Sequence, residues 1–103
     1  MPKFLATEDY DPTTYVDDVQ EHLEARGLSH LRVRRHLDCV IIESGPRKDA
    51  IKHARLRRVA KHIWRLEMAT AAEDWQPTPY RDQLKNLLPV LTDDLGWVLA
   101  RRD

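Results

Sequence analysis

Residues 29–35 alternate between apolar and charged side chains, and this alternation constrains the fold more than any other feature of the chain. Leu31 and Val33 fall on one face of the predicted strand. Arg32 and Arg34 fall on the other face. Such a pattern is typical of an antiparallel sheet that buries one face and leaves the other in water. We therefore predict a sheet with its core on one side and arginines on the other.

Three later segments have the composition of further strands. The β-branched run 39–44 predicts a more buried strand that ends at Gly45 and Pro46. Residues 54–59 and 63–68 alternate again and predict a third and a fourth strand. Helix propensity leaves one alternative open, a long helix over residues 54–68.

Two segments have helical spacing. Residues 14–26 carry apolar side chains on one side, and Gly27 follows as a left-handed C-terminal cap. Residues 79–95 repeat leucines at helical spacing, and Pro89 must kink this helix or divide it. The segment 97–99 predicts either a short final strand or a packed tail.

These elements predict one α+β domain in the order α-β-β-β-β-α-β, because 103 residues suffice for a single core. Residues 1–13 are expected to form an extended arm and residues 14–103 the domain, with both principal helices on one face of a four-stranded antiparallel sheet. Trp97 is expected in the core and Trp75 at the surface. The predicted core consists of Val19, Leu23, Val33, Ile41, Trp64, Leu66, Leu84, Leu88 and Leu91.

The charges are distributed unevenly although the formal net charge is zero. Residues 1–25 hold one lysine and seven acidic residues. Residues 26–65 hold twelve lysines and arginines and three acidic residues, and residues 66–103 hold four basic and seven acidic residues. The predicted sheet is therefore basic, a polarity that can mark a binding face.

The outward positions of the predicted strands form the candidate binding site. Such a face could bind phosphates or an acidic protein surface through charge and forked hydrogen bonds. The competing interpretation is that these side chains pair across the sheet with Glu43 and Glu67. The predicted binding residues are Arg32, Arg34, Arg55, Arg57 and Arg65.

A protein partner is the first functional hypothesis, and nucleic acid is the alternative. A pI near 7.0 gives weak long-range attraction to a polyanion, and Trp64 is expected on the inward face, where it cannot stack on bases. A second copy of the chain is the other candidate partner, because the first helix carries an acidic outer face formed by Asp17, Asp18, Glu21 and Glu24. We expect a small non-catalytic interaction module.

Catalytic, metal and membrane motifs are lacking in the sequence. It contains no nucleophile elbow and no phosphate-binding glycine loop, and His36 with Cys39 supplies only half of a zinc site. No enzyme activity, cofactor or metal is therefore predicted. No apolar run approaches the ~18 residues of a membrane span. The lone Cys39 fits a reducing compartment, so the expected location is the cytoplasm.

Overall fold

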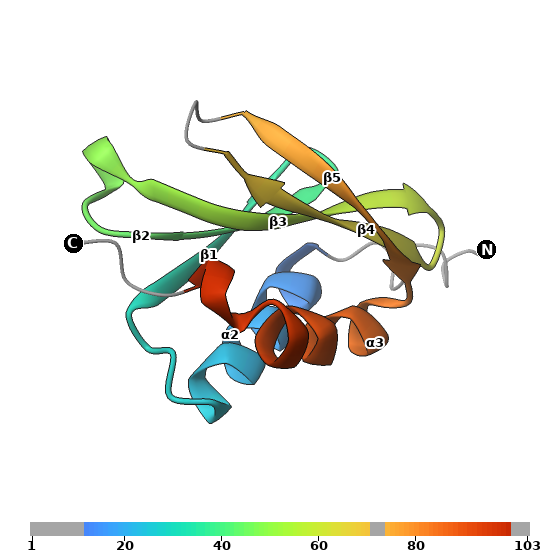
Figure 1. The fold of residues 1–103 in the computed structure, drawn as a ribbon, viewed down its shortest axis with the longest axis horizontal. Helices are drawn as coiled ribbons and strands as arrows, with labels where there is room; N and C mark the ends of the chain where they lie inside the picture. The colour runs from blue at the N-terminus through green and yellow to red at the C-terminus, as the bar shows by residue number, and fades with distance from the viewer. Residues whose placement is uncertain (1–11, 71–73, 100–103) are drawn as a thin grey trace.

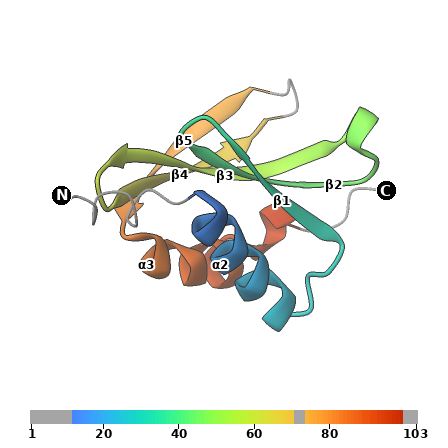
Figure 2. The same ribbon diagram turned by 180° about the vertical axis from the view of Figure 1, so that it is seen from behind.

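The computed structural model of the protein describes residues 12–70 and 74–99. A five-stranded antiparallel sheet forms one layer, and the helices cover one of its faces (Figures 1 and 2). The strands lie in sequence order and are β1 (Leu31–His36), β2 (Cys39–Ser44), β3 (Ile51–Ala60), β4 (Ile63–Ala69) and β5 (Trp75–Asp82). The other layer holds α2 (Pro12–Ala25), α3 (Leu84–Pro89), the π-helical η2 (Val90–Asp94) and the 3₁₀ turn η3 (Gly96–Leu99). This confirms the α+β class and the position of the helices on one face.

Helix α2 begins two residues before the predicted start and ends as expected at a glycine cap. Gly27 has φ +76°. Its N–H donates to the carbonyl of Glu24 at 3.0 Å, and the N–H of Leu28 donates to that of Leu23 at 3.0 Å. This pair of bonds is a Schellman motif, which satisfies carbonyls that the end of the helix leaves open. The remainder of the predicted arm, residues 1–11, lies outside the described residues.

The four predicted strands are present, so residues 54–68 form a hairpin and not a long helix. Leu31 and Val33 are buried against the helices, as the alternation predicts. Ile41 is buried too, but on the other face, because its cross-strand neighbours are Arg34 and Arg55. Its expected place in the helix-side core was therefore wrong.

The fifth strand was not predicted, and it replaces the expected start of the second helix. Residues 75–82 pair with β4, and the Thr78 hydroxyl donates to the Leu66 carbonyl at 2.7 Å instead of capping a helix. Pro77 and Pro79 destabilise this strand little, because an edge strand uses only half of its N–H groups to pair with its neighbour. The helical part of the predicted 79–95 begins only at Leu84.

The second helix changes its geometry at Pro89, as expected for a residue that lacks an N–H donor. The α-helical turns stop there, and η2 continues with a bond from the N–H of Leu95 to the carbonyl of Val90 at 3.0 Å. The final segment forms η3 and not a strand. Val98 and Leu99 are buried, but Trp97 is 66% exposed, so the prediction that Trp97 belongs to the core was wrong.

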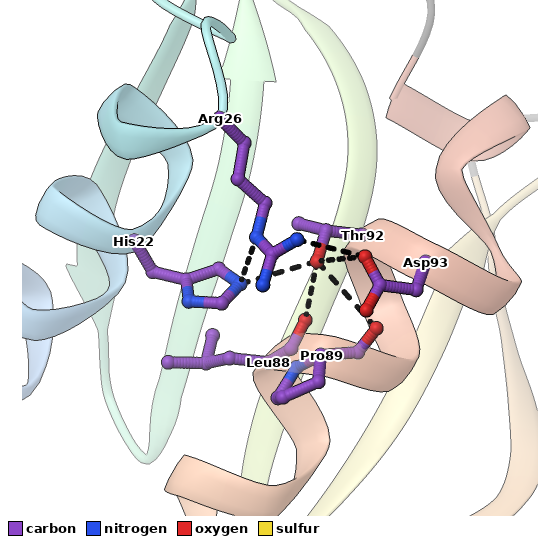
Figure 3. A network of polar contacts seen from close by, with 6 residues as sticks. All are labelled: His22, Arg26, Leu88, Pro89, Thr92 and Asp93. Carbon is purple, nitrogen blue, oxygen red and sulfur yellow. Dashed lines mark hydrogen bonds and ion pairs between the residues drawn. The ribbon is translucent and has the colours of Figure 1, made fainter.

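A polar network joins α2 to η2 on the helix side of the molecule (Figure 3). The Nε–H of Arg26 donates to Nε2 of His22 at 3.1 Å, and Nη1 of Arg26 pairs with Asp93 at 2.8 Å. Thr92 Oγ1 lies 3.1 Å from the same His22 nitrogen and also donates to the Leu88 carbonyl. Because Nε2 accepts the hydrogen bond from Arg26, the imidazole is neutral.

None of the helices within residues 12–70 and 74–99 is long and apolar enough to cross a membrane.

Candidate interaction surface

All five predicted binding arginines lie on the face of the sheet opposite the helices, which we call the open face (Figure 1). Cross-strand neighbours share a face. Arg32 faces Glu43 across β1 and β2, Arg55 faces Glu67 across β3 and β4, and Arg57 faces Arg65. A sixth arginine, Arg81 of β5, faces Arg65. Six arginines and two glutamates thus share this face.

Glu43 is the centre of the first ion-pair cluster, and its side chain is only 4% exposed. Nη2 of Arg32 donates to Oε2 of Glu43 at 3.0 Å, and Nε of Arg34 donates to Oε1 at 3.0 Å. Nη1 of Arg32 also donates to the Gly45 carbonyl at 2.7 Å. Arg32 is therefore held by both of its terminal nitrogens, whereas Arg34 is held through Nε.

Glu67 is the centre of the second cluster and is 2% exposed. Nε of Arg55 donates to Oε1 of Glu67 in a short contact. Arg65 donates to Oε2 through Nε at 3.1 Å and Nη2 at 2.6 Å. Both carboxylate oxygens are thus occupied, as a buried charge requires.

Two opposing effects act on the pKa of both carboxyl groups. Burial raises the pKa of Glu43 and of Glu67. Hydrogen bonds and positive charge from the arginines outweigh burial, so the net pKa of each glutamate lies below its ordinary value. Both glutamates are therefore ionised at neutral pH.

Four of the five predicted binding residues thus form ion pairs with Glu43 or Glu67, which was the competing interpretation of the pattern. Three of these arginines pair across neighbouring strands, whereas Arg65 pairs with Glu67 within β4. The Arg55 and Arg65 side chains are 18% and 22% exposed, so the expectation that Arg55 is solvated was wrong. Ile41 is buried although no helix lies above it, and its cross-strand neighbours are Arg34 and Arg55, whose alkyl stems can cover apolar surface. Arg57 differs, because it is exposed and forms no ion pair with any residue of 12–70 or 74–99.

Trp75 adds an aromatic ring to the open face. It is half-buried, and the Arg55 guanidinium lies 4.6 Å from the centroid of its ring. Sequence reasoning placed this tryptophan at the surface but missed its relation to the arginines, because the strand that carries it was not predicted. Such a cation–π contact helps to orient the Arg55 guanidinium.

Both edges of the sheet are protected against pairing with another strand. At the β1 edge, the Gln20 side chain accepts from the N–H of Val33 at 3.2 Å and donates to the Leu31 carbonyl at 3.4 Å. At the β5 edge, Pro77 and Pro79 carry no N–H. Strand addition is therefore disfavoured at both edges of the sheet.

Ser44, His53 and Cys39 carry nucleophilic or titratable side chains, and all three residues are buried. The Ser44 hydroxyl donates to Nε2 of His53 at 2.8 Å, and Nδ1 of His53 donates to the Val98 carbonyl at 3.0 Å, so both ring nitrogens are used in a fully buried ring. Burial raises the pKa of the Cys39 thiol against the opposing charge of Arg55 and Arg57, which keeps the thiol protonated at neutral pH. No group of three potential metal ligands occurs among the described residues.

Comparisons of the chain with known protein families, with curated proteins and with solved structures find no match. Its function must therefore be inferred from the chemistry of this surface.

Proposed function

We propose that this protein is a small non-catalytic interaction module whose open face binds an acidic segment of a protein, either a separate partner or a second copy of the chain. The observation that carries the proposal is the excess of positive charge on the one sheet face that no helix covers. The two glutamates of that face are each shared by two arginines, so they cannot neutralise the remaining cations. A carboxylate-rich ligand would supply the missing charge.

The unpaired cations distinguish this face from an ordinary solvated sheet. Arg57 and Arg81 are exposed, and neither side chain forms a hydrogen bond or ion pair with the described residues. The paired arginines around them are held in place by Glu43 and Glu67, so they lose little side-chain freedom when a ligand binds. A preorganised guanidinium array favours the forked hydrogen bonding of carboxylates.

A second copy of the chain could also supply the carboxylates that the open face would bind. The exposed side chains of Asp17, Asp18, Glu21 and Glu24 belong to α2, which lies on the opposite side of the sheet (Figure 2). The two sides of the molecule therefore carry opposite charge, with acidic side chains on α2 and basic side chains on the open face. Contact between unlike surfaces of two copies is heterologous and would give a concentration-dependent series of oligomers.

Nucleic acid is the second candidate, and Trp75 is the observation that favours it. An aromatic ring beside arginines on an open sheet is the arrangement by which single-stranded nucleic acids are stacked and held. Against it, four of the six arginines already bind glutamates, and the whole chain has a pI near 7.0. We therefore favour the acidic protein segment.

The test compares fluorescently labelled oligoglutamate with labelled single-stranded oligonucleotide at ~0.15 M salt, where diffuse attraction is screened. Oligoglutamate should bind, and Arg57→Glu should weaken its binding severalfold. Arg35→Glu is the matched control, because Arg35 is exposed but lines a hollow beside Tyr15 and Trp64 on the helix side.

Each other outcome has a defined meaning. Oligonucleotide binding that is tighter, steeply salt-dependent and lost in Trp75→Ala would favour the second candidate. A wild-type protein that ignores both ligands and stays monomeric in light scattering would refute both candidates.

A further inference from the structure

A groove of about 750 Å³ lies at the end of the open face where β2 connects to β3. The 3₁₀ turn η1 (Arg47–Asp49) forms one wall, and the end of β4 forms the other. Both walls rise from the sheet on the side away from the helices (Figure 1). The described residues that line it are Arg34, Glu43, Arg47, Lys48, Asp49, Ala50, Ile51, Lys52, Ala69 and Thr70.

The lining contains four cations and two carboxylates. Glu43 is already bound to arginines and is nearly inaccessible. Arg47, Lys48 and Lys52 form no hydrogen bond or ion pair with any other described side chain. Like charges that share a concave surface repel one another and concentrate positive potential there. An anionic ligand would therefore reduce the electrostatic repulsion among these cations.

Arg34 is the member of the groove with the most specific geometry. It binds Glu43 through Nε, and its two terminal nitrogens form no hydrogen bond within the described residues. Arg32 contrasts with it, because both of its terminal nitrogens are used by Glu43 and Gly45. Glu43 thus fixes the Arg34 side chain and leaves its forked end free, which is the geometry that holds a carboxylate through two parallel hydrogen bonds.

We propose that this groove is the anchoring site for the acidic segment, an inference that rests on the proposed function. One carboxylate accepts both hydrogen bonds from the terminal nitrogens of Arg34, and neighbouring carboxylates of the same segment lie against Lys48 and Lys52. Singly charged groups spaced along a peptide suit a lining in which the exposed Asp49 stands among the cations. A dense run of phosphates would suit it less, since more of its charge would face the Asp49 carboxylate.

The test measures oligoglutamate binding to Lys48→Glu/Lys52→Glu. Lys48 is exposed and Lys52 half-buried, so the fold should survive. Arg35→Glu/Lys85→Glu is the matched control, because it makes the same change in net charge at exposed residues outside the open face. We expect the groove variant to bind about tenfold more weakly or worse, and the control to bind within about twofold of wild type.

The outcomes separate this inference from the proposed function. If the groove variant binds like wild type while Arg57→Glu binds weakly, the open face is the binding surface and the groove is not its anchor. If wild type binds no oligoglutamate, both proposals fail. Inorganic phosphate that competes with oligoglutamate at equal concentration of negative charge would also overturn the inference, because the groove would then select charge alone.

Discussion

Replacing Glu67 by glutamine removes one negative charge from the best-paired position of the open face. Breaking a buried ion pair by removing one partner costs about 3–5 kcal/mol. Arg55 and Arg65 keep some contact with water, and the glutamine oxygen can still accept one hydrogen bond. We therefore expect Glu67→Gln to lower the free energy of unfolding by about 2–3 kcal/mol, which corresponds to a Tm lower by about 10–20 °C.

The assay is urea unfolding of wild type, Glu67→Gln and the exposed control Glu21→Gln, whose cost should stay below about 0.5 kcal/mol. The effect should also depend on pH. The net pKa of Glu67 is lowered below its ordinary value of 4.5, so protons favour the unfolded chain. The advantage of wild type should be complete above pH 4.5 and should shrink as the pH falls through the lowered pKa. A cost below about 0.5 kcal/mol at neutral pH would show that the cluster does not stabilise the fold.

Two further predictions concern the helix layer. Leu88 is 6% exposed, so Leu88→Ala should cost about 2–5 kcal/mol in the same unfolding assay, and a cost near that of a surface substitution would disprove its role in the core. Burial, followed by the charge of Arg26, lowers the pKa of His22 from its ordinary value of 6.5. The free energy of unfolding should therefore fall as the pH drops from 6.5 through this lowered pKa. The variant His22→Gln should not show this fall. A variant with the same pH profile as wild type would contradict a neutral, half-buried imidazole at His22.

The sequence was sufficient to predict the open face because strand alternation is a local property. The period of two in residues 29–35 placed Arg32 and Arg34 outside, and the cap at Gly27 ended α2 as predicted. The burial of the ion pairs could not be predicted from the alternation. It depends on register, which brings Glu43 opposite Arg32 and Glu67 opposite Arg55 across separate hairpins.

The fifth strand could not be predicted because its local signal has two meanings. Proline next to threonine is typical of a helix start, and proline is also tolerated in an edge strand. Pairing of residues 75–82 with β4 decides between them, and such pairing is a tertiary interaction. The contact of Trp75 with Arg55 and the groove beside η1 both depend on tertiary structure, so neither could have been found before the fold was known.

The most direct test of the interaction surface is to map oligoglutamate binding on the ¹⁵N-labelled wild-type protein by NMR at ~0.15 M salt. We expect amide signals to shift along the open face, above all at Arg57, Lys48 and Lys52, and the Nε–H signal of Arg34 to shift with them. Signals of α2 and α3 should stay in place. Shifts confined to the helix layer, or no shifts at saturating peptide, would contradict the claim that the open face binds acidic segments.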